Sequence, residues 1–555
     1  MLVASLLAAA LGGAPNSEAS ALPFPMVVLS DRGQDGIELA LNPLAAQPLE
    51  QLGATRLQGM PLPGGGAVDL LLKRVELRSK ESRVVVDGVP VDETPAVSLW
   101  HGEVAGFEGS EAFFAFSPLG TRGWVTLAGA TFELLAFPDA DGSWERSTSV
   151  LLGHDRLSTL AGPPKLACAG SPMPTPSTAP GPRLATISGL GGGLAASAPL
   201  LPYYECHVAV ETDYQFYQIF NDLPAAQAYA AALLGAVAGR YREQVGVIFT
   251  FPYLGFHTNS NDGWVAQENG SGSIGLLFEF QAAWQNGGAP VTADVYHFLS
   301  GANLGGGVAY LPAVCDQGYG FGVSGNLGGN TPFPVSPGWL NWDFIVVAHE
   351  LGHNFNAPHT HDYCPPLDEC APAGYFGACQ TQNVCTTQGT VMSYCHICGN
   401  GMSNMTTFFH PQSVADMRAY TTSSCLTPFQ GVLNASSYGA GLAGSNGVPK
   451  LSVGFQASPT EQLVLSATQA PASQLGVLLV GESSISLPFL GGTLVTSAEY
   501  GFVFSSTASG TASVSIPVGG LAFAAGLALY AQGWWINNAT TFASSAGLSF
   551  ELVVL

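Results

Sequence analysis

The stretch that decides the fold is Ala348–Asp362, which reads AHELGHNFNAPHTHD. Its first two histidines, His349 and His353, are four positions apart, so on a helix both imidazoles lie on one face and reach the same metal ion. Glu350 follows the first histidine, which places a carboxylate beside the metal but off the ligand positions. A carboxylate there has the chemistry to accept a proton from an attacking water. The spacing therefore predicts a zinc site on an apolar helix.

A catalytic zinc site needs a third protein ligand, and His359 stands ten positions after His349. The long pattern H-E-x-x-H-x-x-G-x-x-H has a glycine where this chain has Asn356. That glycine leaves the helix in a left-handed conformation, which asparagine tolerates well, and Pro358 favours a helix stop. His361 is an alternative third ligand. Its longer spacing favours His359 instead and predicts for His361 a place next to the ligands or at the surface.

A second signature lies at Thr390–Tyr394, which reads TVMSY. Met392 follows His359 by 33 positions in a predicted tight turn, and this arrangement resembles the Met-turn of metzincin zinc metalloproteases. The resemblance implies that the methionine forms a hydrophobic floor under the zinc and does not bind it. Tyr394 has the spacing at which a tyrosine of astacins and serralysins binds zinc or stabilises the oxyanion. The alternative for this residue is a packed aromatic ring.

Residues 201–428 resemble more specifically the reprolysin (adamalysin, ADAM-like) group of metzincins. Gly307–Leu311, followed by Cys315, resembles the edge strand beside the substrate cleft of that group. The resemblance implies an α/β catalytic domain with a twisted sheet and an active-site helix. It also implies hydrolysis of peptide bonds by a zinc-activated water, with the glutamate of the motif as general base. Two departures from the group's pattern are Asn356 for glycine and Thr360 where many reprolysins have aspartate.

Ten cysteines are typical of a protein made for an oxidising compartment. Eight of them fall between Cys315 and Cys425, which indicates disulfides within one domain, although spacing alone does not determine the pairs. The family resemblance implies the pair Cys315–Cys425. The other six would then pair among themselves: Cys364, Cys370, Cys379, Cys385, Cys395 and Cys398. Cys168 has two interpretations: a cysteine switch that holds the zinc and keeps the enzyme latent, or a disulfide with Cys206.

The rest of the chain divides by composition. Residues 1–21 are predicted to be a signal peptide, because an apolar run precedes small A-x-A-like residues; the alternative is an apolar first strand, since no basic residue precedes the run. Residues 22–168 are predicted to be β-rich and weakly resemble reprolysin propeptides. Residues 169–200 are rich in Pro, Gly, Ser and Ala, as in linkers that proteases can reach. Residues 431–555 alternate short apolar runs with turn residues, which predicts an all-β sandwich.

The overall composition excludes several classes of function. Of the 555 residues only 10% are charged, with a net charge of −23, so a phosphate backbone would be repelled and nucleic-acid binding is not expected. The hydrophobic share of 47% is too high for long disorder. The N-terminal apolar run is too short to span a bilayer, so no membrane span is expected. No EF-hand loop is present, and a structural calcium ion remains an open alternative.

These features predict a multidomain, secreted zinc endopeptidase that is made as a latent zymogen and acts on proteins or peptides outside the cell. The first alternative is a non-enzymatic adhesin that contacts a cell surface or a polysaccharide through residues 431–555. Trp534 and Trp535 would then form a platform, unless both belong to the core. The intact motif argues against a dead protease. A zinc hydrolase that acts on another bond is the second alternative.

Overall fold

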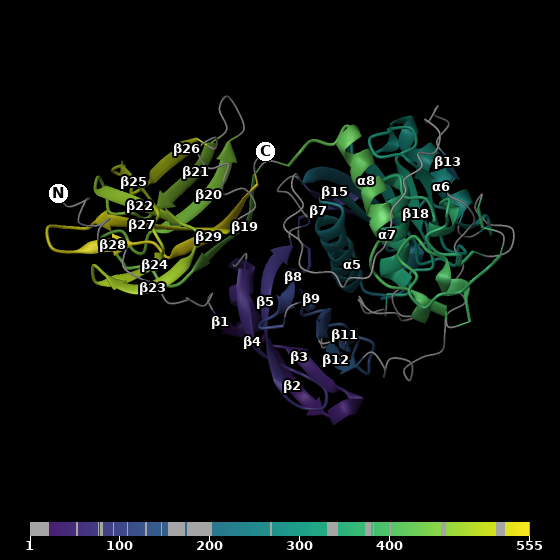
Figure 1. Ribbon diagram of the computed structural model, residues 1–555, viewed down its shortest axis with the longest axis horizontal. Helices are drawn as coiled ribbons and strands as arrows, with labels where there is room; N and C mark the ends of the chain where they lie inside the picture. The colour runs from purple at the N-terminus through teal and green to yellow at the C-terminus, as the bar shows by residue number, and fades with distance from the viewer. Residues whose placement is uncertain are drawn as a thin grey trace.

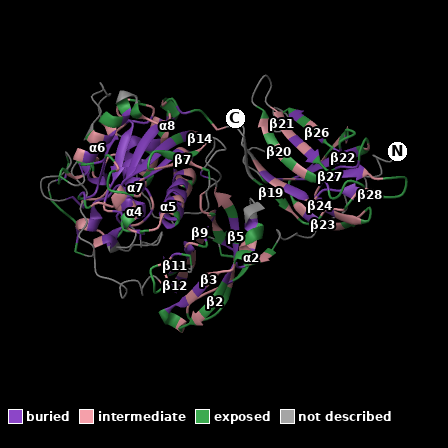
Figure 2. Ribbon diagram, turned by 180° about the vertical axis from the view of Figure 1, so that it is seen from behind, coloured by how far each residue is buried: buried purple, intermediate pink, exposed green. Residues whose placement is uncertain are grey.

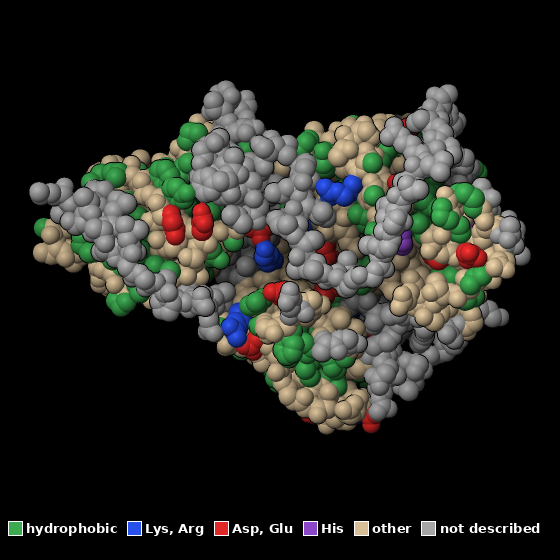
Figure 3. Space-filling view, viewed as in Figure 1, with side chains coloured by type: hydrophobic (Ala, Val, Ile, Leu, Met, Phe, Trp, Pro, Cys, Tyr) green, Lys and Arg blue, Asp and Glu red, His purple; other side chains and the backbone are tan. Residues whose placement is uncertain are grey.

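The computed structural model consists of three β-rich parts that follow one another along the chain (Figure 1). The residues that it describes are 21–51, 54–75, 77, 82–92, 94–107, 109–127, 130–145, 147–153, 173–174, 203–266, 269–329, 342–371, 379–380, 382–399, 401–429, 431–456, 462–517 and 528–553. Residues 1–20 of the predicted signal peptide, Cys168 and most of the predicted linker lie outside these ranges. None of the helices described is long and apolar enough to cross a membrane. Few charged side chains stand out on the face drawn in Figure 3.

The central sheet contains the part of the chain that carries the histidine motif. Its eight strands lie in the order β13-β17-β18-β16-β14-β15-β6-β7. All neighbours from β18 to β6 are parallel, whereas β17 is antiparallel to β18. In that order the strands are Met173–Pro174, Gly307–Leu311, Phe321–Ser324, Val295–Leu299, Tyr204–Thr212, Val247–Phe256, Arg83–Val86 and Val89–Val91. Strand β17 therefore lies near one edge of the sheet and the β6–β7 hairpin forms the other.

Helices cover both faces of this sheet, which explains why its strands are continuous apolar runs. Helices α5 and α7 share one core with one face, and α6 shares a second core with the opposite face. The main helices are α5 (Leu223–Gln244), α6 (Gly272–Ala283), α7 (Trp342–Asn354) and α8 (Pro411–Ser423), with the shorter α2 (Pro43–Ala46) and α4 (Tyr214–Gln218). The predicted edge strand Gly307–Leu311 matches β17.

The N-terminal part is a ten-stranded sheet in the order β1-β4-β5-β8-β9-β10-β11-β12-β3-β2. In that order the strands are Ala21–Pro23, Ala54–Pro61, Ala67–Val75, Ser98–Val104, Glu111–Phe116, Arg122–Leu127, Ala130–Phe137, Thr148–Gly153, Ile37–Leu41 and Met26–Asp31. Side chains on one side of this sheet, such as Trp100 and Phe114, form a separate core. Their neighbours Leu99 and Phe113 belong to the core of α5 and α7 instead. The sheet thus uses both of its faces.

The C-terminal part has two antiparallel sheets that share one core. The larger sheet has the order β19-β29-β27-β22-β25, with β28 beside β27, and the smaller has the order β20-β21-β26. The strands of both sheets and of the β23–β24 hairpin are Gly431–Tyr438 (β19), Lys450–Gln456 (β20), Gln462–Thr468 (β21), Leu475–Gly481 (β22), Ser484–Phe489 (β23), Gly492–Thr496 (β24), Tyr500–Ser505 (β25), Ala512–Pro517 (β26), Ala528–Ile536 (β27), Phe542–Ser544 (β28) and Gly547–Val553 (β29). Trp534 and Trp535 are buried, so they are core residues and form no exposed platform. Glu551 contacts Lys73 of β5 and lies 3.5 Å from the guanidinium of Arg242 on α5, so this part touches both others.

Candidate metal centre

Helix α7 carries the first two histidines and is buried at every position (Figure 2). At its first turn the carboxylate of Asp343 accepts hydrogen bonds from the amides of Gly328 and Gly329, each at 3.0 Å, and from the hydroxyl of Tyr229 at 2.5 Å. In the middle, the Tyr241 hydroxyl of α5 donates to the carbonyl of Ala348 at 2.9 Å. These bonds hold the helix immediately before the first histidine.

The other end of α7 is fixed by Asn354, a residue that the sequence did not single out. Its buried side-chain amide donates to the carbonyl oxygens of Tyr310 on β17 (3.0 Å) and Phe321 on β18 (3.2 Å). The backbone carbonyl of Asn354 accepts the amides of Ala313 and Val314. The only sequence signal for this role is an amide side chain at the end of the histidine helix. Asn354 sets the distance between the histidine helix and strand β17.

The three predicted ligands meet at one point. His349, His353 and His359 each offer a ring nitrogen, and these atoms all lie within 4.8 Å of one another. All three side chains are buried. The ring centroids of His349 and His353 are 4.6 Å apart, and that of His359 lies 4.7 Å from His353. The structure therefore brings together residues that a helix and a following loop supply separately.

Each of these imidazoles is oriented through its Nδ1 atom. The Nδ1–H of His349 donates to the carbonyl of Val391 at 2.7 Å, and that of His353 donates to the carbonyl of Ala357 at 2.7 Å. The Nδ1–H of His359 donates to a carboxylate oxygen of Asp362 at 3.2 Å. Because these acceptors fix the tautomer, the lone pair of each Nε2 is left for a metal. Three neutral imidazoles aimed at one point are the donor set that zinc accepts at catalytic sites.

The environment favours the neutral form that metal binding requires. Burial lowers the pKa of His349 to about 4, since the opposing effect of the hydrogen bond to Val391 is smaller. Burial, followed by the neighbouring histidines, lowers the pKa of His353 and His359 well below the usual value. At neutral pH the three rings carry no proton that a metal would have to displace.

The helix ends where the sequence predicts, and Asn356 is the reason. Its φ of 74° lies in the left-handed region. Its amide donates to the carbonyl of His353, and the next amide, that of Ala357, donates to the carbonyl of Gly352, both at 2.9 Å. This pair of bonds is a Schellman cap, in which glycine is usual and asparagine is tolerated. The cap turns the chain so that the third histidine comes back toward α7.

The turn around Met392 supports two of the ligands through its backbone. The carbonyl of Val391 orients His349, and the carbonyl of Met392 accepts the amide of Thr360, next to His359, at 3.1 Å. The methionine side chain is fully buried against α7. A Cβ atom placed on Gly352 would lie 2.6 Å from its sulfur atom, so the helix has a glycine where the methionine packs.

Glu350 lies between the histidines and strand β17. A Cβ atom on Gly307 would come within 2.4 Å of its Oε1, so the carboxylate rests directly on the backbone of that strand. Its Oε2 is buried without a hydrogen-bond partner among the described residues. Burial raises the pKa of Glu350 well above the ordinary value. Such an orphaned carboxylate fits a site built for a cation and a water, since either would favour its charged form.

Three further aromatic side chains surround the triad. The ring of Tyr394 lies 4.4 Å from His359 and 6.2 Å from His349, centroid to centroid. His361 is buried and stacks on His359 with centroids 5.0 Å apart, so it lies next to the ligands and not at the surface. His396 is also buried, and its ring centroid lies 5.7 Å from that of Tyr394. The sequence offered no spacing signal for His396.

The cysteines pair as the resemblance implies for Cys315–Cys425. The remaining disulfides are Cys364–Cys379, Cys370–Cys395 and Cys385–Cys398. Among the described cysteines Cys206 is a buried free thiol. Cys168 itself lies outside the described residues. His410 caps α8, since its Nδ1 accepts the amide of Gln412 at the start of that helix (3.1 Å).

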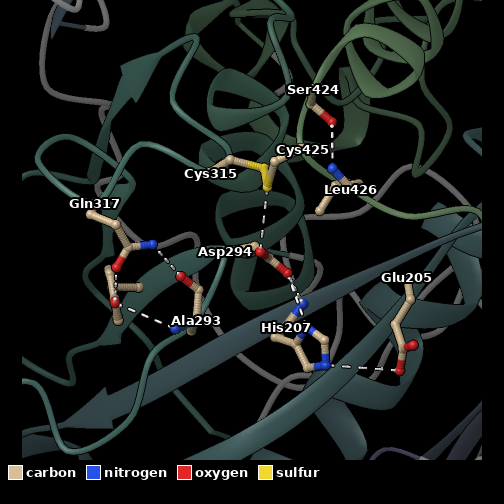
Figure 4. A network of polar contacts seen from close by, with 10 residues as sticks. Glu205, His207, Ala293, Asp294, Cys315, Gln317, Ser424, Cys425 and Leu426 are labelled. Carbon is tan, nitrogen blue, oxygen red and sulfur yellow. Dashed lines mark hydrogen bonds and ion pairs between the residues drawn. A yellow bond between two sulfur atoms is a disulfide. The ribbon is translucent and has the colours of Figure 1, made fainter.

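A polar network surrounds the Cys315–Cys425 disulfide (Figure 4). One carboxylate oxygen of Asp294 accepts the backbone amide of His207 at 2.8 Å and lies 3.0 Å from its Nδ1. Asp294 raises the pKa of His207, chiefly through this hydrogen bond. None of the groups that could hold a metal among the described residues consists of carboxylates alone, so calcium gains no support.

A comparison with protein-family models matches the part of the chain that carries the histidine site. A family model described as metallo-peptidase family M12, of the reprolysin type, matches residues 203–409. Similar solved structures include metalloproteinase-II from Bacteroides fragilis, with 11% identity, a TM-score of 0.35, and coverage of 66% of this chain and 95% of that chain. Another is OgpA from Akkermansia muciniphila, with 13% identity, a TM-score of 0.23, and coverage of 64% and 95%. No curated protein sequence gives a significant match. Residues 203–409 are therefore a reprolysin-like metallopeptidase domain of family M12.

Proposed function

We propose that the chain is a secreted, zinc-dependent endopeptidase that is made in a latent form and cleaves extracellular proteins with Glu350 as general base. The observation that carries this proposal is the convergence of three neutral imidazoles beside a buried carboxylate, at strand β17. The ten cysteines, eight of them in disulfides, support an oxidising compartment. The predicted signal peptide supports export.

The residues around the triad have distinct roles in this proposal. His349, His353 and His359 would hold the zinc ion, which when bound supplies a Lewis acid that polarises a carbonyl and acidifies a water. Glu350 would accept the proton of the attacking water and pass it to the leaving amine. Tyr394 is our candidate for a donor to the oxyanion, because its ring lies against His359 and His349.

Strand β17 would bind the substrate main chain. Its Gly307 has no side chain, and the carboxylate of Glu350 occupies that space, so the strand backbone lies directly against the proposed general base. Sheet edges commonly bind extended peptides through main-chain hydrogen bonds. Such binding depends on the backbone of the substrate more than on its side chains, which suits a protease that acts on varied proteins.

Latency is supported by what lies on that edge. Strand β13, Met173–Pro174, pairs in parallel with Tyr310 and Leu311 of β17. A segment from before the metallopeptidase domain therefore occupies part of the edge that a substrate would need. The cysteine switch at Cys168 remains part of the proposal, and the free thiol of Cys206, the other member of the alternative disulfide, supports it.

Casein cleavage by the zinc-loaded protein, cut in the linker, tests the function. We expect activity that a chelator abolishes and that Glu350→Gln reduces about 10²–10⁴-fold, the usual contribution of a general base. Glu482→Gln, at an exposed turn of the C-terminal part, is the matched control and should keep wild-type activity. Equal rates for wild type and Glu350→Gln, with zinc content verified, would reject the proposal and favour a binding protein.

A further inference from the structure

We propose that residues 21–153 are a permanent part of this peptidase, which stays bound to residues 203–555 after the chain between them is cut. The inference rests on the proposed function in one respect only, that a cut in this region activates the enzyme. The interface itself is argued from the contacts of the described residues. It differs from the sequence-based expectation that residues 22–168 form a propeptide.

The first argument is that the N-terminal part completes the central sheet. Strand β6 pairs in parallel with the end of β15, with Arg83–Val86 opposite Tyr253–Phe256. The pairing continues on both sides: the carbonyl of Leu77 accepts the amide of Phe251, and the amide of Asp87 donates to the carbonyl of Phe256, each at 2.9 Å. Without the hairpin, β15 would expose a row of unpaired backbone groups in a sheet whose parallel strands are otherwise buried.

The second argument is the burial of helix α5 on all sides. Of its 22 residues 15 are buried, although a helix that covers one face of a sheet needs only one apolar stripe. One side packs toward α7, where Tyr241 bonds to Ala348. The opposite side packs on the N-terminal sheet: Leu99 fits over Gly235, with its Cδ1 2.8 Å from where a Cβ would stand. Removal of residues 21–153 would leave a large apolar surface in water.

Two buried guanidinium groups make contacts across the same interface, one with a carboxylate and one with an aromatic ring. The guanidinium of Arg240 on α5 is almost fully buried and lies 3.0 Å from the carboxylate of Glu111 on β9. In the other direction, the buried guanidinium of Arg122 on β10 lies over the ring of Tyr229 on α5, 5.2 Å from its centroid. The indole of Trp144 donates to the carbonyl of Phe220 at 3.3 Å. Separation would break the Arg240–Glu111 pair, leaving Arg240 with Glu243 of its own helix, and would remove the ring contact of Arg122.

The N-terminal part joins the central sheet at the edge that lies away from the proposed substrate site. In the order of the central sheet the β6–β7 hairpin is at the opposite edge from β17. Within the described part of the chain, the only strand from before residue 203 on the β17 edge is the two-residue β13. Withdrawal of β13 would free the substrate edge while the N-terminal sheet stays in place. Activation therefore needs a cut, and it does not need the N-terminal part to leave.

The experiment places a specific protease site between residues 175 and 202 of the full chain and cuts the purified protein. We expect both fragments to elute together in native buffer as a 1:1 complex by native mass spectrometry, and to separate only in denaturant. Leu99→Asp should abolish co-elution, because it places a charge against Gly235. Leu71→Asp, the same change at an exposed position on neighbouring β5, should leave the complex intact.

Hydrogen exchange of the cut protein gives a second measurement that needs no variant. Continued protection of the amides of Tyr253–Phe256 supports the proposal, whereas fast exchange there overturns it. Separation of the fragments in native buffer, with residues 203–555 still folded and active, also overturns it. A complex that co-elutes, binds zinc and cuts no protein would reject the proposed function and leave this inference standing.

Discussion

The two edges of the central sheet differ in how firmly they are covered. At one edge, β13 pairs through only two residues with β17, the strand whose Gly307 adjoins Glu350. At the other, β6 pairs with β15 through four residues, and a shared core and buried ion pair reinforce the contact. The difference indicates that one cover is removable and the other is structural. The following predictions test this comparison.

The largest effect is expected from His353→Ala at the catalytic edge. Loss of a ligand should remove zinc from the purified protein and reduce proteolysis by more than the roughly 10–100-fold typical of altered supporting groups. Metal analysis by mass spectrometry and casein cleavage measure the two effects. His207→Ala, next to Asp294, is the control and should keep its zinc. Stoichiometric zinc in His353→Ala would contradict the assigned ligand set.

At the opposite edge, Val84→Asp should destabilise the protein by about 3 kcal/mol or more, because it buries an unpaired charge. Val84 is 4% exposed and faces the core of α5 and α7. Val89→Asp in the same hairpin, at a 62% exposed position, should change the free energy of unfolding by less than about 0.5 kcal/mol. Urea unfolding compares them. Similar losses in both variants would mean that the hairpin is not integrated into the core.

Gly352→Ala tests the packing of α7 on the Met392 turn. The added methyl would lie 2.6 Å from the methionine sulfur, and such overpacking costs about 1–3 kcal/mol. Gly239→Ala on α5 is the matched control: nothing lies within 4 Å of its Cβ position, so alanine should stabilise that helix by up to about 1 kcal/mol. Thermal unfolding shows the opposite signs. A stabilised Gly352→Ala variant would reject the packing described for Met392.

The smallest effect concerns pH at the structural edge. Burial would raise the pKa of Glu111, but Arg240 and His101 outweigh burial and lower it from 4.5 to about 2. Because the folded pKa is below the unfolded one, the stabilisation is complete above pH 4.5 and is lost as the pH falls toward 2. Linkage predicts a loss of about 1 kcal/mol by pH 3.5. Glu111→Gln should flatten this part of the stability profile, measured by denaturant unfolding, and an unchanged slope would contradict the pair.

The sequence predicted the parts of the site that depend on local spacing. The helical pair His349 and His353 and the left-handed exit at Asn356 follow from short patterns, which backbone geometry determines almost alone, whereas the place of β17 was implied by the family resemblance. The family resemblance supplied the pair Cys315–Cys425, which spacing could not.

What the sequence could not predict depends on partners far along the chain. Nothing within Arg83–Val86 distinguishes a strand of the N-terminal sheet from a strand that pairs with β15. The roles of Asp343 and Asn354 likewise depend on amides and carbonyls of distant loops. An apolar pattern shows that a face is buried, but it does not show what covers that face.

The pairing of β6 with β15 has a consequence for how the protein folds. Asp87 and Thr258, which are hydrogen-bonded at the end of this pairing, are 171 residues apart in the sequence. Contacts between residues so far apart in the sequence form late, because the entropy lost in closing a long loop must first be compensated. During synthesis the edge of the β6–β7 hairpin therefore stays unpaired until β15 and the rest of the α/β part have been synthesised. Changes that delay this meeting should appear first as aggregation in the cell, before any loss in the activity of the folded enzyme.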